Sequence, residues 1–162
     1  MVEGGRMKLL VFMRKDLGMS PGKMAVQFGH ASQYMTEKII TGSVFLDEIE
    51  KISSNSTHTE FDVKSIIRSG KHAMWMSNDF AKICLEVPSK GFDLKTSEFN
   101  TPATELAIIS ATAISHGFST VEVIDKGRTE IPEDTLTCVG ALVPKDDKTF
   151  KDYNLWKDKN AK

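Results

Sequence analysis

The stretch "KLLVFMRKDLGMSPGKMAVQFGHAS", residues 8–32, contains a strand, a turn and a helix start in immediate succession. Residues 8–14 are a continuous apolar run between charges, which is typical of a strand covered on both faces. Ser20 is a suitable helix N-cap, and Pro21 suits the first helical position. The stretch therefore predicts a buried strand that leads directly into a helix.

Two stripes of side chains run along this predicted helix. Lys23, Gln27, His30 and Tyr34 follow one another at intervals of four, three and four residues, which places them on one face. The adjacent stripe is apolar and is expected to pack in the core; it consists of Met24, Phe28, Ala31 and Met35. Lys23 falls in the first turn, where the helix dipole disfavours a cation by about 0.3–1 kcal/mol. A polar face with a cation in this position indicates a functional site.

The rest of the chain alternates between strand and helix patterns. The elements expected after this helix are, in order, short helices over 44–52 and 61–69, a strand over 80–87, a helix over 101–117, and strands over 119–125 and 135–143. In the helix over 101–117, Thr101 is the expected N-cap and Gly117 the expected C-cap. The last two strands are joined too closely for a helical crossover. We therefore predict a small α/β sandwich with a mixed sheet.

Composition restricts the class of protein. The chain has 162 residues, 40% of them hydrophobic and 27% charged, which predicts one ordinary globular domain. A net charge of -1 means that any polyanion would be bound by a local patch. Cys84 and Cys138 lack metal-site spacing and are expected to be free thiols. Because the N-terminal apolar run is too short for a signal peptide or a membrane span, we expect a cytoplasmic protein with no membrane partner.

Motif searches argue against several kinds of site. The chain has no G-x-G-x-x-G, no G-x-x-x-x-G-K-[ST] and no G-x-S-x-G motif. Its four histidines are scattered without ligand spacing, so neither a metal nor a cofactor is expected. The charged tail over about 145–162 is expected to be partly mobile.

A second informative stretch is "DKGRTEIPEDTLT", residues 125–137, which directly follows a predicted strand. It therefore lies at the carboxyl edge of the sheet, where α/β folds place their binding sites. The helix that carries Lys23 also begins after the carboxyl end of a strand. If these two strands are parallel neighbours, Lys23 and Asp125 face each other across one cleft.

Residues 8–32 and 123–144 together resemble the archaeal and eukaryotic type of peptidyl-tRNA hydrolase. Both motifs of that family, D-L-x-M-x-x-G-K-[IM]-A-x-Q-x-x-H-A and D-x-G-R-T-x-[IV]-x-x-x-T-x-T, are matched in order. The resemblance implies a three-layer α/β/α sandwich with a mixed four-stranded β-sheet, formed by one domain over 1–162. It leaves an atypical insertion over about 41–75, and this chain has Lys126 and Glu130 where the family commonly has Ala and Gln.

The implied reaction is hydrolysis of the ester that joins a peptide to the 3′-terminal ribose of tRNA. Lys23, beside free N–H groups at the helix N-terminus, would hold an oxyanion or the terminal phosphate. Asp125 would orient or activate water, or position Lys23. Four further residues would position substrate or water by hydrogen bonds: Gln27, Thr129, Thr135 and Thr137. Two others, Lys126 and Arg128, would bind phosphate. His30 would be a substrate-binding residue or a general base, or else a structural helix residue.

Other functions remain compatible with these motifs. The same fold would serve as a non-catalytic module that binds RNA or a protein, and the near-neutral charge, Glu130 and the 41–75 segment favour that alternative. The site would also suit another aminoacyl-tRNA ester, such as D-aminoacyl-tRNA. In any of these cases we predict weak, strongly salt-dependent binding of the tRNA acceptor end. A homodimer would fit the resemblance.

Overall fold

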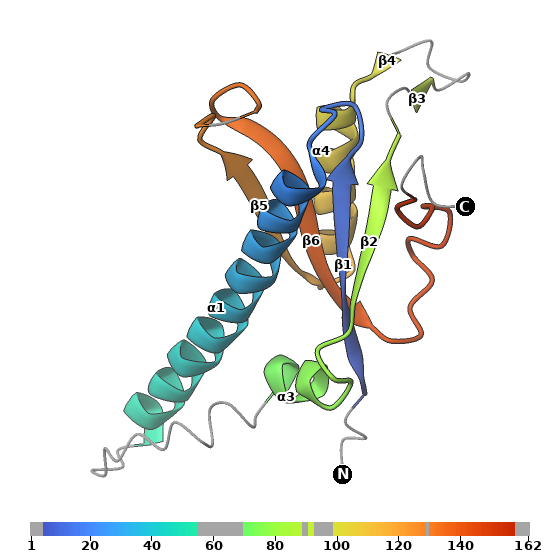
Figure 1. The fold of residues 1–162 in the computed structure, drawn as a ribbon. Helices are drawn as coiled ribbons and strands as arrows, with labels where there is room; N and C mark the ends of the chain where they lie inside the picture. Colours follow the sequence, from blue (N-terminus) through green and yellow to red (C-terminus); the bar gives the residue numbers. More distant parts are fainter. Residues whose placement is uncertain (1–4, 55–69, 89–90, 93–98, 129, 158–162) are drawn as a thin grey trace.

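The computed structural model describes residues 5–54, 70–88, 91–92, 99–128 and 130–157. The elements along these residues are β1 (Met7–Arg14), α1 (Pro21–Ser54), α3 (Gly70–Met76), β2 (Lys82–Val87), β3 (Gly91–Phe92), β4 (Phe99–Asn100), α4 (Pro102–Ser115), β5 (Ser119–Asp125) and β6 (Thr135–Pro144). Figure 1 shows how they are arranged around a central sheet. The expected strands, and the helices that begin at Pro21 and Pro102, are confirmed.

The sheet has four strands in the order β2-β1-β6-β5. β1 is parallel to β2 and antiparallel to β6, and β5 is antiparallel to β6, so the sheet is mixed as predicted. The sequence analysis placed Lys23 opposite Asp125 on the condition that β1 and β5 are parallel neighbours. They are not neighbours, because β6 returns from the loop after β5 and lies between them. β1 and β5 nevertheless run in the same direction, so their carboxyl ends lie at the same edge of the sheet.

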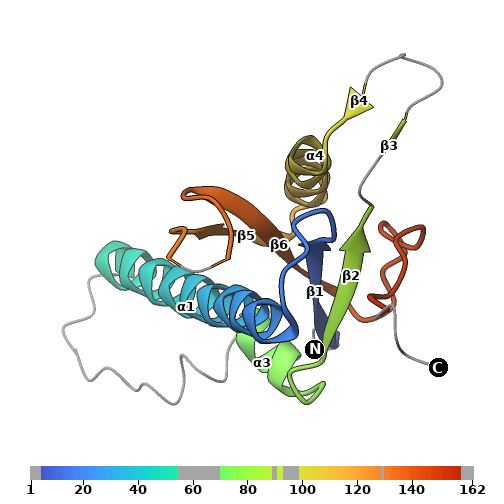
Figure 2. The same ribbon diagram turned by 45° about the horizontal axis from the view of Figure 1, so that its top comes forward.

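Each face of the sheet has its own apolar core. Along β1, Leu9, Val11 and Met13 belong to the core beneath α1 and α3, which also contains Ala31, Met35 and Trp75 of those helices. The alternate residues Leu10 and Phe12 belong to the core beneath α4, with Leu106 and Ile109. This alternation follows from the two-residue period of a strand. The result is a three-layer α/β/α arrangement, visible in the turned view of Figure 2.

The helices differ from the prediction between residues 41 and 76. α1 continues without a break to Ser54, about 50 Å at 1.5 Å per residue, so the separate helix expected over 44–52 is wrong. The single Gly42 does not end the helix, because a helical glycine costs only about 0.5–1 kcal/mol. The helix expected over 61–69 lies outside the described residues, and α3 was not predicted.

α4 has the expected termini. The Thr101 hydroxyl accepts a hydrogen bond from the Thr104 N–H at 3.2 Å, as an N-cap does. Gly117 follows the helix with a φ of 73°, a conformation that favours glycine at a helix stop.

The C-terminal segment packs against the sheet as far as Trp156. It is part of the tail over about 145–162 that the sequence led us to expect to be partly mobile, and residues 158–162 of that tail lie outside the described residues. Phe150 is buried in the core beneath α4, and its ring contacts Phe12 edge-on at 4.9 Å. Leu155 then pairs with Leu85 in an antiparallel bridge, flanked by hydrogen bonds from Glu86 N–H to Asn154 and from Trp156 N–H to Cys84. The segment therefore covers the β2 edge of the sheet, where an open strand would promote aggregation.

Among the described residues, no helix has the length and apolar character needed to cross a membrane.

Candidate active site

The N-terminus of α1 is capped from two directions. As predicted, the Ser20 hydroxyl accepts a hydrogen bond from the Lys23 N–H, at 3.2 Å. Glu130, from the loop after β5, accepts hydrogen bonds from the Ser20 N–H at 2.9 Å and from the Ser20 hydroxyl. These two hydrogen bonds lower the pKa of Glu130, with a smaller effect of the Lys23 charge. Because α1 has no acidic residue in its first turn, Glu130 supplies the negative charge that a helix N-terminus favours.

A bulge between β5 and β6 turns Thr137 towards α1. The register shifts between Val123 and Ile124, so Cys138 lies opposite Val123 whereas Leu136 lies opposite Ile124. The extra residue is Thr137, which is fully buried. Both residues contact Gln27 of α1: Thr137 bonds to the Gln27 side chain, and Cys138 bonds to the Gln27 backbone carbonyl oxygen. Bulges are frequent next to active sites because they redirect a side chain in this way.

Four polar side chains meet where α1, β5 and β6 come together. The Lys23 Nζ donates to Asp125 Oδ2. The Gln27 amide nitrogen donates to the same oxygen at 2.8 Å. The Thr137 hydroxyl in turn donates to the Gln27 amide oxygen at 2.8 Å, and it also lies 3.1 Å from the Val123 carbonyl oxygen. Thr137, Gln27, Asp125 and Lys23 thus form one connected hydrogen-bond network, which we call the Lys23 network.

Asp125 is the centre of the Lys23 network and is 8% exposed. The hydrogen bond from Lys23 is the largest influence that lowers its pKa, with further lowering by the Gly127 N–H and Gln27, against the opposite effect of burial. Gly127 donates to Asp125 Oδ1 at 2.7 Å. Asp125 is therefore a carboxylate at neutral pH with both oxygens engaged, which makes it a poor proton acceptor. Its geometry suits the positioning of Lys23 and Gln27.

Gly127 gives the loop after β5 its tight shape. Its φ is 68°, and a Cβ at this position would lie 2.4 Å from the Glu133 nitrogen. Only glycine fits without moving the backbone. The close turn directs the Gly127 N–H at Asp125 and carries Glu130 to the start of α1.

The other predicted site residues that the structure describes are more exposed than Gln27, Asp125 and Thr137. His30 is half-buried and its ring stacks on Tyr34, with centroids 5.8 Å apart. Arg128 is exposed. Lys126 is exposed and pairs with Asp134 at 3.1 Å. The Thr135 hydroxyl donates to the Pro132 carbonyl oxygen at 2.7 Å, within its own loop. Thr129 lies outside the described residues.

The structure limits the expected role of the helix N-terminus. The sequence placed Lys23 beside free N–H groups at this end of the helix, but the Lys23 N–H donates to the predicted Ser20 cap and the Ser20 N–H donates to Glu130. The sequence reasoning missed this role of Glu130. The signal was present, because a first turn that contains a lysine and no acidic residue of its own needs an anion from elsewhere in the chain.

Thr137→Val is expected to destabilise the fold. Valine keeps the shape but leaves the buried Gln27 amide oxygen without the Thr137 donor, which costs about 1–3 kcal/mol of unfolding free energy. Urea titration should show a lower midpoint with an unchanged slope. Thr135→Val is the matched control, because its hydroxyl bonds at the exposed loop, and it should lose less. Equal losses in both variants would contradict a special role for the buried hydrogen bond.

Glu130→Gln is expected to strengthen binding of a nucleic-acid anion beside α1. The change removes a negative charge near Lys23 and leaves one oxygen to accept from Ser20. We expect the Kd for a nucleic acid to fall about three- to tenfold at low salt, with the difference shrinking as salt screens the charge. Glu133→Gln, an exposed carboxylate of the same loop, is the control. A rise in Kd for Glu130→Gln would mean that anchoring of the loop to Ser20 is the more important effect.

Comparison with known proteins adds the family. A family model described as peptidyl-tRNA hydrolase PTH2 matches residues 7–154. The chain is 29% identical over 133 residues to a peptidyl-tRNA hydrolase of Thermoplasma volcanium, covering 82% of this chain and 81% of the relative. It is 29% identical over 138 residues to one of Sulfurisphaera tokodaii, covering 82% of each chain. It is 27% identical over 134 residues to one of Sulfolobus acidocaldarius, covering 83% and 84%.

Proposed function

This chain belongs to the peptidyl-tRNA hydrolase PTH2 family, and on that premise we propose that it hydrolyses the ester bond of peptidyl-tRNA, releasing the peptide and free tRNA. The observation that carries the proposal is the Lys23 network, which holds an ammonium group and a carboxylate in a nearly buried contact. A module that only binds RNA has little need of such an arrangement. The site also fits the chemistry of the reaction, which develops negative charge on the ester carbonyl oxygen.

In this proposal Lys23 is the catalytic group that faces the developing charge. Its side chain is 11% exposed, so the charge acts where little water screens it. Asp125 and Gln27 are positioning residues, and Thr137 fixes which end of the Gln27 amide faces Asp125. Asp125 is not assigned the role of general base in this proposal, because both of its oxygens already accept hydrogen bonds from Lys23, Gln27 and Gly127.

We assign the outer residues to the substrate. Arg128 is exposed on the loop that also positions Asp125, and its guanidinium suits a phosphate of the acceptor end. The Lys126–Asp134 pair is a surface ion pair, about 69% and 68% exposed, and such pairs contribute little and exchange readily for another anion. His30, Thr129 and Thr135 complete the proposed substrate-binding set.

The test is a comparison of N-blocked and unblocked aminoacyl-tRNA as substrates. Cleavage of the blocked ester by wild-type protein, with little cleavage of the unblocked ester, supports a hydrolase for peptidyl-tRNA. Cleavage of the unblocked ester alone would mean another aminoacyl-tRNA hydrolase. Binding of tRNA by the folded protein without cleavage of either would contradict the proposal and favour a binding module. Binding should weaken steeply with salt, as phosphate contacts require.

The proposal extends to the setting of the reaction. We place the protein in the cytoplasm, where it would release tRNA during ribosome rescue; Cys84 and Cys138, both free thiols, are in keeping with a reducing compartment. We also propose a homodimer. Its support is the exposure of three apolar side chains on α4 and on the edge strand β5, which are Ile108, Ile114 and Ile124. Sedimentation equilibrium tests this, and a monomer at micromolar concentration would contradict it.

A further inference from the structure

Arg14, the last residue of β1, connects two elements that supply side chains to the Lys23 network. Its Nε and Nη2 atoms donate to the two carboxylate oxygens of Asp16, at 3.0 and 2.7 Å, which makes a bidentate pair. Its Nη1 atom donates to the Leu136 carbonyl oxygen at 3.1 Å. The Arg14 side chain is 14% exposed, so little water competes for these bonds. One guanidinium thus joins the loop that leads into α1 to the start of β6.

The bond from Arg14 to Leu136 lies next to the bulge that turns Thr137 towards α1. The ladder between β1 and β6 ends at Cys138, one residue short of Thr137. The Arg14 side chain extends the connection beyond that point, because it holds the backbone of the residue directly before Thr137. The Thr137 hydroxyl in turn donates to the Gln27 amide at 2.8 Å. The place of this backbone therefore affects the place of the Gln27 amide in the Lys23 network.

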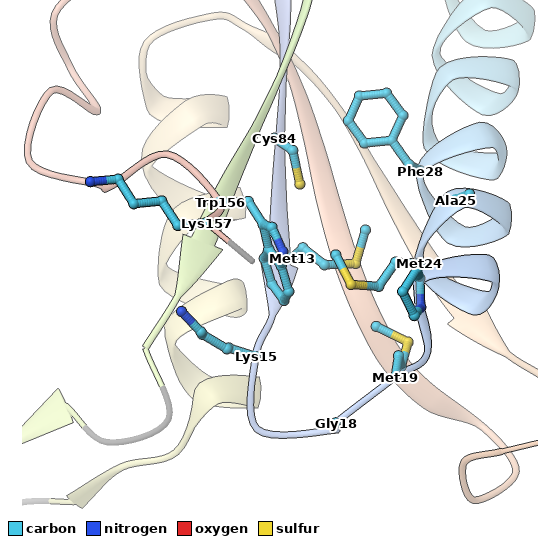
Figure 3. Close-up of a pocket in the computed structure, with 11 residues that line it drawn as sticks. Met13, Lys15, Gly18, Met19, Met24, Ala25, Phe28, Cys84, Trp156 and Lys157 are labelled. Carbon is cyan, nitrogen blue, oxygen red and sulfur yellow. The ribbon is translucent and has the colours of Figure 1, made fainter. Parts of the chain in front are cut away.

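The bond from Arg14 to Asp16 holds the loop that carries the chain from β1 into α1. Figure 3 shows this loop between Lys15 and Met19, where it borders a cavity of about 720 Å³. Side chains that line a cavity have fewer packing partners, so packing supports the loop less on that side. The position of the loop then depends more on polar contacts at its start, which are the bond to Asp16 and the pair of Lys15 with Glu86. Since α1 begins directly after the loop, these contacts also affect where its first turn lies.

We propose that Arg14 is a positioning residue for the hydrolysis, because it holds the start of α1 and the bulge of β6 at the spacing that the Lys23 network requires. The inference rests on the proposed hydrolase function. Arg14 acts through Asp16 and the Leu136 backbone, so it is not a catalytic residue. Its role needs the fork geometry of a guanidinium, with three nitrogens that donate in fixed directions. A lysine ammonium is a point charge and does not reproduce this fork.

The experiment measures kcat and KM of Arg14→Lys with N-acetyl-aminoacyl-tRNA as substrate. The substitution keeps the positive charge that attracts tRNA, so KM should stay within about twofold of the wild-type value. We expect kcat to fall about 10- to 100-fold, since small misplacements of reacting groups have effects of this size. Lys15→Met is the matched control: it removes the pair with Glu86 at the same turn, but β2 supplies no residue to the Lys23 network. Its kcat should stay near the wild-type value.

A double-mutant cycle with Thr137→Val separates positioning from stability. If Arg14 acts through the bulge, the losses of kcat in Arg14→Lys and Thr137→Val are not additive in free energy. The double variant should then lose little more than the more strongly affected single variant. Circular dichroism and urea titration restrict the comparison to folded protein. If the double variant does not fold, the comparison of Arg14→Lys with Lys15→Met decides.

Each contrary result has a distinct meaning. Wild-type kcat in folded Arg14→Lys would restrict the guanidinium to stability of the fold. A rise in KM without a fall in kcat would mean that Arg14 contacts the tRNA directly. Additive losses in the double variant would mean that Arg14 and Thr137 act independently. Each of these three results overturns the inference and leaves the hydrolase function intact, whereas the absence of hydrolysis by the wild type would overturn both.

Discussion

Lys23→Met is expected to lower kcat for N-acetyl-aminoacyl-tRNA about 10²- to 10³-fold, the effect of removing one group that stabilises an oxyanion. Methionine preserves the unbranched side chain and its packing while removing the charge. Asp125 keeps its hydrogen bonds from Gln27 and Gly127, so the carboxylate is not left without partners and the fold should persist. Single-turnover kinetics with saturating enzyme separate this effect on chemistry from weaker binding.

The control for Lys23→Met is Lys126→Met. Both changes remove one lysine charge from the same region, but the Lys126 side chain is 69% exposed and lies in the loop after β5. Lys126→Met should raise KM in a salt-dependent way and leave kcat nearly unchanged. If both variants lose kcat equally, the effect is general electrostatic attraction of tRNA and Lys23 has no special catalytic position.

The parts of the fold that the sequence predicts are those with strong local signals. The apolar run of β1, the Ser20 and Thr101 caps and the glycine after α4 are each decided by a few neighbouring residues. The proximity of Lys23 and Asp125 was also anticipated, on the condition that β1 and β5 are parallel neighbours, whereas the bond between Gln27 and Asp125 was not. Lys23 and Asp125 are close all the same, because β1 and β5 end at the same edge of the sheet even with β6 between them.

The features that the sequence did not predict depend on contacts between distant residues. The Thr137 bulge requires a register shift that no local pattern shows. Glu130 bonds to Ser20, the N-cap of α1, which lies 110 residues earlier. Trp156 lies in a segment whose charge indicated mobility, yet β2 offers it an open edge and an apolar surface. The continuation of α1 through Gly42 is a different case. A single glycine disfavours a helix only weakly, and the helical residues on both sides of Gly42 continue the helix through it.

Asp125→Asn is expected to reduce kcat to a similar extent, about 10²- to 10³-fold, by a different route. Three donors converge on the two carboxylate oxygens: Lys23 and Gln27 on Oδ2, and the Gly127 N–H on Oδ1. Asparagine has one oxygen and an NH₂ group, so at least one of these donors must face another donor. If the asparagine oxygen stays with Lys23 and Gln27, its NH₂ group faces the Gly127 N–H and pushes the loop after β5 away. Lys23 also loses the negative charge that holds its ammonium in place, although the side chain is nearly the same size.

The same variant has a signature in the pH dependence of stability. The folded-state pKa of Asp125 lies below its ordinary value of 3.8, so the stabilisation is fully present above that value. It is lost as the pH falls through the lowered folded-state pKa. Urea unfolding from about pH 5 down to about pH 2 should therefore show a shallower acid-induced loss of unfolding free energy in Asp125→Asn than in the wild type. Glu130, whose pKa is also lowered, leaves a residual slope in the variant.

Asp134→Asn is the matched control for both measurements, because Asp134 pairs with Lys126 at the surface and is 68% exposed. It should change neither kcat nor the acid slope appreciably, since such exposed pairs contribute little. A folded Asp125→Asn protein that retains wild-type kcat but loses the acid slope would restrict Asp125 to a structural role. If Asp125→Asn lowers kcat and also makes the acid-induced loss of unfolding free energy shallower, then Asp125 both stabilises the fold and positions Lys23.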